Sequence, residues 1–229
     1  MKRLTLVLLA LTFCVPAFAG ESQLQKANNV VNEIMGTPDK GIPAELFEKA
    51  VCVGIVPSQI KFALGFGGTY GRGMLVCRRG GNGSWGAPSM FTLGAASIGF
   101  QIGGKATDVI FLVMNPEGAR KFVQDSVKLG GEASVAAGPV GRSAEGATDA
   151  QLHAEILSYS RSRGLFAGLS LDGAVVKQDA EDNQKLYGRK ISAKEILIDG
   201  SVASPRSAGP LDSTLTKYSP RGGQKFSRV

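Results

Sequence analysis

Glycine-rich apolar segments fill the middle of the chain and constrain its fold more than any other feature. The segment 65–73 (GFGGTYGRG) has five glycines and leads into the apolar run MLVC. Apolar and β-branched residues favour strands, and glycines within strands mark bulges, barrel bends or the close approach of another backbone. The strand-like segments are 51–56, 66–79, 89–102, 108–114, 133–140 and 154–176. Short glycine turns such as GGNG at 80–83 join them.

Helical signals lie on both sides of these segments, and each is short. Residues 21–35 place apolar side chains near helical spacing, which predicts an amphipathic helix. The other predicted helices are 43–50, 116–128, 179–187 and 192–198. Asn115, Asp179 and Ser192 are their expected N-caps, and Gly188 is an expected C-terminal stop. The sequence therefore predicts an α+β fold: a largely antiparallel, Gly-rich β-sheet or barrel-like core with a few short flanking helices.

The N-terminus has the pattern of an export signal. Lys2 and Arg3 precede an apolar run over 4–15, and Ala17-Phe-Ala19 resembles a cleavage site. We predict that residues 1–19 are a signal peptide. The mature protein would then be exported, to a periplasmic or outer-membrane-associated location. The apolar run is too short to cross a bilayer as a helix.

The C-terminal segment 201–229 is rich in Ser, Pro, Gly and Arg and lacks apolar periodicity, so it is predicted to be a disordered basic tail. Residues 20–200 would then form a single domain. The chain has a formal net charge of +7, but most of the excess lies in the two ends. The near-neutral domain gives no reason to expect a nucleic-acid partner. The tail would attract anionic surfaces without specificity.

The thiol and imidazole inventory of the mature chain is small. Cys52 and Cys77 lie in strand-like runs, and they would either pair in an oxidising compartment or remain buried free thiols. The sequence does not decide between these alternatives. With His153 as the single histidine, a structural zinc site is not expected. We expect no metal and no cofactor.

Two stretches superficially resemble catalytic motifs. The segment 168–173 (GLSLDG) is similar to a nucleophile elbow, but Asp172 occupies the place of the last glycine, and a strand-like run follows instead of a helix. A hydrolase using Ser170 and His153 is therefore only a remote alternative. The GFGGTYGRG run lacks the lysine of a phosphate-binding loop and is followed by a strand. We expect no catalytic residues and no enzymatic activity.

The best polar site in the sequence is an alternating strand. Arg161 and Arg163 alternate with serines, so strand periodicity places both arginines on one face together with Tyr159. Two adjacent guanidinium groups bind phosphate or carboxylate well. The alternative is a solvated face with local ion pairs. Asp108, at the start of an apolar strand, is expected to satisfy backbone amides in a turn.

Several blocks of the sequence resemble the SYLF lipid-binding domain family. The blocks are Val53–Ser58, Gly67–Gly73, Trp85–Ser89, Gly99–Asp108, Ala136–Arg142 and most of 154–176. They occur in the family's order and spacing between about Leu24 and Asp199. The resemblance implies a domain that binds phospholipids, which are phosphoinositides in eukaryotic members, and that does not act as an enzyme. Some members also bind actin.

For an exported chain, this resemblance implies binding of anionic phospholipid at a bacterial membrane surface, and it makes actin an unlikely partner. A structural or protein-interaction module of the cell envelope, with an envelope protein as partner, is the alternative. The predicted headgroup contacts are Arg161, Arg163, Arg72 and Lys105. The predicted membrane contacts are Leu24, Val31 and Ile34, from the N-terminal helix that contacts membranes in some relatives.

Overall fold

A computed structural model describes residues 18–36, 41–64, 66–98, 105–141, 153–162 and 165–219. Nine strands form one sheet. They are β1 (Cys52–Leu64), β2 (Phe66–Cys77), β3 (Ser89–Ile98), β4 (Lys105–Val113), β5 (Ser126–Lys128), β6 (Val135–Ala137), β7 (Ile156–Ser162), β8 (Leu165–Gly168) and β9 (Val175–Gln178). Their spatial order is β5-β9-β3-β2-β1-β4-β7-β6, and β8 pairs with β7. Among the described strand pairs, β6–β7 alone is parallel.

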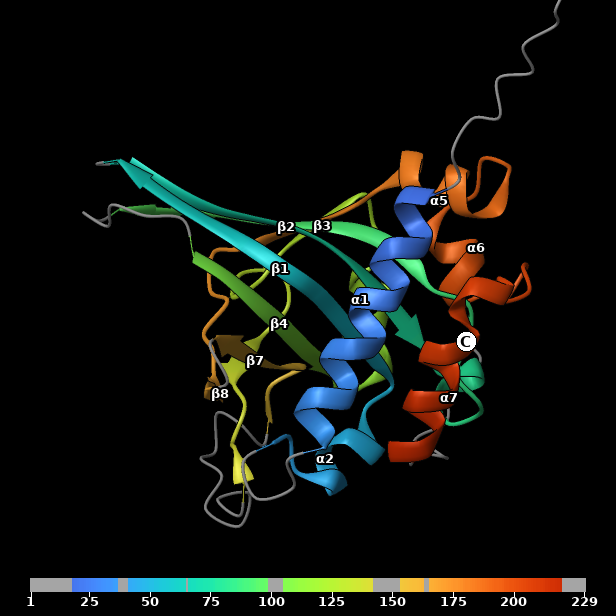
Figure 1. The fold of residues 1–229 in the computed structure, drawn as a ribbon, viewed down its shortest axis with the longest axis horizontal. Coiled ribbons are helices and arrows are strands. Elements are labelled where there is room, and N and C mark those ends of the chain that lie inside the picture. The colour runs from blue at the N-terminus through green and yellow to red at the C-terminus, as the bar shows by residue number, and fades with distance from the viewer. Residues whose placement is uncertain are drawn as a thin grey trace, which may run out of the picture.

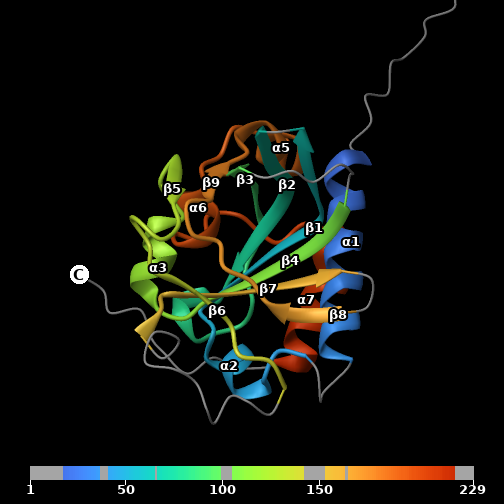
Figure 2. The ribbon, with the colours of Figure 1, turned by 90° about the vertical axis from the view of Figure 1, so that its left-hand side faces the viewer.

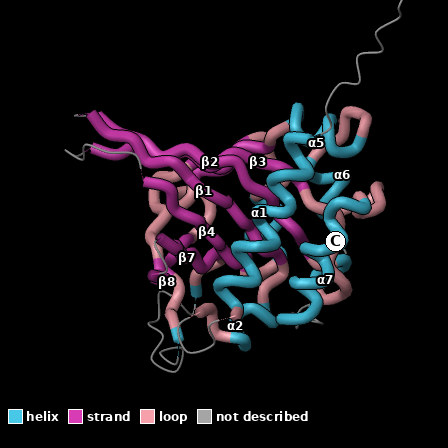
Figure 3. The backbone as a smooth tube through the Cα atoms, in the orientation of Figure 1, coloured by secondary structure: helices cyan, strands magenta, loops and turns pink. Residues whose placement is uncertain are grey.

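Most of the labelled helices gather at the end of the sheet away from the tips of β1 and β2 (Figures 1 and 3). They are α1 (Phe18–Met35), α2 (Ala44–Lys49), α3 (Pro116–Lys121), α5 (Ala180–Tyr187), α6 (Ala193–Leu197) and α7 (Gly209–Tyr218), with 3-10 turns η1 (Arg79–Gly81) and η3 (Arg206–Ala208). Figure 2 shows α1 and α7 along one face of the sheet and α3 and α6 on the opposite side. The predicted α+β class, with a mostly antiparallel sheet, is confirmed.

Each face of the sheet has its own apolar core. One cluster contains Phe91, Phe111 and Phe122, with rings of Phe111 and Phe122 stacked at 5.3 Å between centroids. The other includes alternate residues of β1 and β2 and is covered by α1, α2 and α7. Burial of apolar surface on both faces explains why the 109–113 part of β4 is apolar throughout, as its sequence predicted.

Glycines let large rings pack directly on the strands. A Cβ built on Gly54 would overlap the ring of Phe111, and one on Gly138 would overlap the ring of Tyr159. Close packing on a strand backbone is one of the roles that the sequence pattern predicted for such glycines. β1 also changes register between Ile55 and Ile60, where Ser58 has a φ of 54°. This bulge bends the strand.

Cys52 and Cys77 form a disulfide between β1 and β2. The two residues are direct partners in the register of these strands, with their Cα atoms 4.0 Å apart. The alternative of two free thiols, which the sequence left open, is therefore not what the structure contains.

Two sequence predictions about extent are wrong. The helix predicted for 116–128 ends at Lys121, and 126–128 instead forms β5, because these residues pair with β9 and bury Val127. The predicted disordered tail is folded as far as Ser219. Leu211 and Leu215 on α7 are buried, and Thr214 hydrogen-bonds to Asn28 of α1 at 2.7 Å. Residues 220–229 of the predicted tail lie outside the described residues, as do residues 1–17 of the predicted signal peptide.

Local signals predicted several other elements correctly. The Asn115 side chain accepts a hydrogen bond from the amide of Gly118, and Asp179 caps α5, which ends at Gly188 with a φ of 69°. Ser192 and Glu195 form a reciprocal capping box. The strand-like segment predicted at 154–176 contains β7 and β8, which pair with Ser162 opposite Leu165.

Candidate functional site

Arg161 lies at the centre of an ion-pair cluster that joins three elements. Its Nη2 donates to Oδ2 of Asp108 on β4 at 2.6 Å, and its Nε donates to the same oxygen at 3.1 Å. Its Nη1 pairs with the carboxylate of Glu33 on α1. Burial lowers the pKa of Arg161 from its usual value. Because two carboxylates already hold this guanidinium, its main contact in this conformation is to α1 and the sheet.

Asp108 has a second role in the same cluster. Its Oδ1 accepts a hydrogen bond from the backbone amide of Ser58 at 2.8 Å. Ser58 is the residue with positive φ in the β1 bulge. The carboxylate therefore stabilises the bulge and orients Arg161 at once. The sequence prediction that Asp108 satisfies backbone amides agrees with this contact.

Arg72 is the most accessible of the predicted headgroup contacts whose side chains are described. It lies on β2, and its side chain is 47% exposed. Its Nη1 is 3.4 Å from Oδ2 of Asp182 on α5. A hydrogen bond with Tyr70, followed by the negative charge of Asp182, raises the pKa of Arg72 above its usual value. Asp182 also pairs with Lys185 at 2.9 Å, so it is shared between two cations.

The other two predicted headgroup contacts are only partly placed. Arg163 lies outside the described residues, between β7 and β8 in the sequence. Lys105 begins β4, directly opposite Lys61 of β1 in the strand register. The structure thus brings Lys105 close to Lys61, a residue that was not predicted. It does not place Arg72 in the Arg161 cluster.

The predicted membrane contacts on α1 are buried. Leu24, Val31 and Ile34 belong to the core beneath α1, where they pack with side chains of β1, β2 and α7. In this conformation they form no membrane-facing surface. The prediction of an amphipathic helix is confirmed, but the apolar face of this helix packs against the sheet. Among the described helices, none is long and apolar enough to cross a membrane.

Two exposed apolar side chains were missed by sequence reasoning. Ile60 on β1 and Tyr70 on β2 are 55% and 46% exposed, and they are direct partners across the strand pair. They lie beyond the β1 bulge, where the strands continue past the helical cover. A signal was present in the sequence, because Ile60 follows Pro57 and Ser58, a pair that favours a bend or turn.

The segment that resembled a nucleophile elbow is a polar turn. The Ser170 hydroxyl donates to Oδ2 of Asp172 at 2.6 Å, within an exposed turn after β8. Its neighbour Gly173 has a φ of 78°. The described residues contain no cluster of three or more His, Cys, Asp or Glu side chains able to hold a metal ion.

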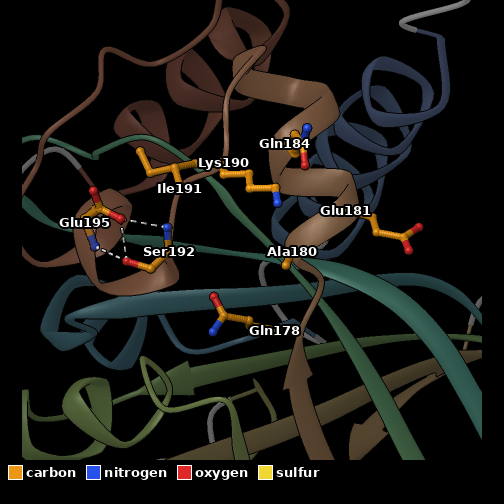
Figure 4. A pocket seen from close by; sticks show the side chains of 8 residues that line it. All are labelled: Gln178, Ala180, Glu181, Gln184, Lys190, Ile191, Ser192 and Glu195. Carbon is orange, nitrogen blue, oxygen red and sulfur yellow. Dashed lines mark hydrogen bonds between the residues drawn. The ribbon is translucent and has the colours of Figure 1, made fainter.

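A shallow depression of about 550 Å³ lies between β9, α5 and α6 (Figure 4). Its lining residues are Gln178, Ala180, Glu181, Gln184, Lys190, Ile191, Ser192 and Glu195. Several of the polar groups already have structural partners. Hydrogen bonds from the Ser192 backbone and hydroxyl lower the pKa of Glu195, and Gln178 accepts from the Ala193 amide at 2.9 Å. The wall of the depression therefore consists partly of helix-capping groups.

The curled sheet and its helical cover define an α+β domain whose accessible polar residues are suited to contacts with other molecules. A family model described as "Ysc84: Las17-binding protein actin regulator" matches residues 94–218, more than half of the chain. The chain belongs to this family, which is the SYLF domain family that its motifs resemble.

Relatives with similar sequences are eukaryotic proteins. LAS seventeen-binding protein 3 of Saccharomyces cerevisiae is 33% identical over 220 residues, covering 90% of this chain and 47% of the relative. Protein YSC84 of the same yeast is 36% identical over 200 residues, covering 83% and 42%. SH3 domain-containing YSC84-like protein 1 of Homo sapiens is 34% identical over 212 residues, covering 88% and 61%. The chain thus spans roughly half of the length of these curated relatives. Their names describe binding and domain content.

Proposed function

We propose that this protein binds anionic phospholipids and catalyses no reaction. The observation that carries the proposal is an uneven distribution of charge along the sequence. Residues 49–107, which include β1, β2, η1, β3 and the start of β4, contain six Lys or Arg and no Asp or Glu, and one of the six, Arg78, is buried. Accessible cations of this region attract phosphate-bearing membranes. The family's lipid-binding character, which the sequence motifs imply, supports the same function.

The first experiment is vesicle flotation of the full chain. Vesicles of phosphatidylcholine alone are compared with vesicles that also contain phosphatidylglycerol. We expect recovery with the anionic vesicles only, and we expect it to fall as salt is added, because salt screens exposed charges. Equal recovery with both compositions, or no recovery, contradicts the proposal.

The proposed headgroup contacts do not form a single patch of arginines. Arg72 and Lys105 are proposed headgroup contacts because they lie in the carboxylate-free region. Arg161 and Arg163 stay in the proposal as secondary contacts. Engagement of Arg161 by lipid requires competition with Glu33, while the buried Leu24, Val31 and Ile34 keep α1 packed on the sheet. An Arg161→Glu variant that binds vesicles normally would exclude this secondary role.

A second candidate function is protein binding, and the names of the relatives favour it. One yeast relative is named for binding LAS seventeen, and the family description also names actin regulation. The test is cosedimentation with actin filaments together with crosslinking in envelope extract. Sedimentation with actin filaments would contradict our prediction that actin is an unlikely partner. Specific crosslinking to an envelope protein, without vesicle binding, would favour an interaction module.

Location and the lack of catalysis are further parts of the proposal. We propose export to the periplasm or the outer membrane surface, based on the signal-like pattern of residues 1–19. Cell fractionation with and without that segment tests this location. We also propose that ester substrates are not turned over. Hydrolysis that disappears in a Ser170→Ala variant would contradict this part.

A further inference from the structure

The far ends of the central strands project beyond the rest of the fold. We define the projecting end as residues 59–64 of β1, 66–70 of β2, 94–98 of β3 and 105–107 of β4. The strands stay paired there, from Ile60 opposite Tyr70 to Leu64 opposite Phe66. Figure 1 shows this end of β1, β2 and β3 extending away from the helices.

The exposed apolar pair of the projecting end lies on the sheet face that α1 covers elsewhere. Along β2, Met74 is buried under the helical layer, and alternation places Arg72 and Tyr70 on that same face. Tyr70 is 46% exposed, and its partner Ile60 is 55% exposed. An aliphatic side chain and an aromatic one are therefore side by side in solvent, where the cover of α1 has ended. Tyrosine has the amphipathic shape that suits a membrane interface.

The projecting end also carries positive charge. Lys61 and Lys105 are direct cross-strand partners, an arrangement that repels when no anion lies nearby. The nearest carboxylates in sequence and register already have partners: Asp108 holds Arg161 and the Ser58 amide, and Asp182 holds Lys185 as well as Arg72. Alternation places Lys61 and Lys105 on the sheet face opposite Ile60 and Tyr70, so the two groups meet a membrane together when the tip of the strands enters it end-on. Positive charge beside exposed apolar side chains matches the chemistry of an anionic lipid surface.

We infer that the projecting end is the membrane-contacting element, with Ile60 and Tyr70 entering the headgroup–acyl boundary of an anionic bilayer and Lys61, Lys105 and Arg72 meeting lipid phosphates. This inference rests on the proposed lipid-binding function and assigns that function to one part of the fold. It needs no release of α1. The apolar core beneath α1 stays intact when the protein binds the membrane.

The test compares full-chain variants by flotation with phosphatidylcholine–phosphatidylglycerol vesicles. Ile60→Ser with Tyr70→Ser should weaken binding about tenfold, because the variant lacks the two apolar side chains that enter the bilayer. Lys61→Gln should weaken it about fivefold, the value of one cation near an anionic surface. The matched controls are Leu165→Ser, which removes the 78% exposed side chain of β8, and Lys190→Gln at the α5–α6 depression. Both controls should bind like the wild type.

A second measurement locates the contact directly. In a Tyr70→Trp variant, vesicles should shift the emission of the added tryptophan to shorter wavelength, relative to the wild-type protein with its single Trp85. Leu165→Trp should show no such shift. Thermal unfolding followed by circular dichroism verifies that every variant is folded. The substituted side chains are exposed, except that of Lys61, which is half-buried.

The outcomes separate this inference from the function on which it rests. If the wild type binds anionic vesicles and the Ile60/Tyr70 variant binds equally well, the inference is wrong and the proposed function stands. If the folded wild type binds no vesicle, the proposed function is wrong, and this inference falls with it.

Discussion

The guanidinium of Arg78 lies 4.0 Å from the ring centroid of Trp85, and both side chains donate hydrogen bonds to the carbonyl of Ser219. Arg78 is fully buried, and burial lowers its pKa to about 10, so it remains a cation at neutral pH. Its other donors reach the carbonyls of Ala50 and Gly83 at 3.2 and 3.1 Å. This arginine therefore attaches the end of α7 to the sheet.

Replacing Arg78 by Met should lower the free energy of unfolding by about 3 kcal/mol. The loss follows from the carbonyls of Ala50 and Gly83, which would be left without this donor, while the Ser219 carbonyl would keep that of Trp85. Each buried unsatisfied group costs about 1–3 kcal/mol. Urea denaturation measures it. The matched control is Arg79→Met at the neighbouring exposed position, which should change stability by less than about 0.5 kcal/mol. Equal stability of the two variants would show that Arg78 is not an anchor.

Truncation should separate the folded part of the C-terminal segment from the rest. A chain that ends at Gly200 loses α7 and exposes the surface of α1 on which Leu211 and Leu215 pack. We expect it to lose cooperative thermal unfolding. A chain that ends at Ser219 keeps every described contact and should melt like the full chain. Circular dichroism compares the two, and similar melts for both truncations would refute a structural role of α7.

The glycines of the central strands are expected to differ sharply in tolerance. Gly54→Ala would press a methyl group into the Phe111 ring and should destabilise the fold by about 3 kcal/mol, an overpacking cost at the upper end of the usual range. Gly94→Ala is the control, because the nearest heavy atom to its Cβ would be the Thr69 carbonyl oxygen at 3.8 Å. Denaturation of both variants measures the difference. A tolerated Gly54→Ala would mean that the ring has room to move.

Features with local causes could be predicted from the sequence. The caps at Asp179, Gly188 and Ser192 were predicted because cap and capped amides lie within a few residues of each other. The class of the fold followed from alternating apolar runs and glycine turns for the same reason. Alternation along β7 also placed Arg161 on one face with Tyr159, and both now contribute to the α1 side of the sheet.

Features that depend on distant partners could not be predicted. No sequence signal near Arg161 indicates that Asp108, 53 residues away, and Glu33 pair with its guanidinium. α7 was not predicted, because its two buried leucines become core residues only by packing in the cluster that α1 covers. The helix predicted for 116–128 was too long, because pairing of β5 with β9 overrides a helical pattern that has no local stop at Lys121.

Glu155 should make the free energy of unfolding depend on pH in the acid range. Burial opposes its ionisation, but hydrogen bonds from Lys121 and Ser134 outweigh burial and hold its pKa below the usual value. A lowered folded pKa means that its stabilisation is complete above the unfolded pKa near 4.3 and is lost as pH falls through the folded pKa. Glu155→Gln should therefore cost about 1–2 kcal/mol at pH 7 and progressively less below about pH 4.

Urea denaturation of the wild type and the Glu155→Gln variant, at pH 7 and below about pH 4, measures the difference in their free energies of unfolding. Glu181→Gln, at an exposed position on α5, is the control and should be neutral at both. A gap between wild type and Glu155→Gln that stays constant with pH would show that the carboxylate's charge is not the cause.

The disulfide between Cys52 and Cys77 should supply a substantial part of the stability. It closes a loop across a sequence separation of 25 residues. Closing a loop of this size reduces the entropy of the unfolded chain, which stabilises the folded state by about 3 kcal/mol. Replacing both cysteines with Ala should lower the free energy of unfolding by that amount, as measured by urea denaturation without reductant. Reductant should destabilise the wild type similarly and leave the double variant unchanged. A wild type that reductant does not destabilise, although its thiols become titratable, would mean that strand pairing alone holds β1 against β2.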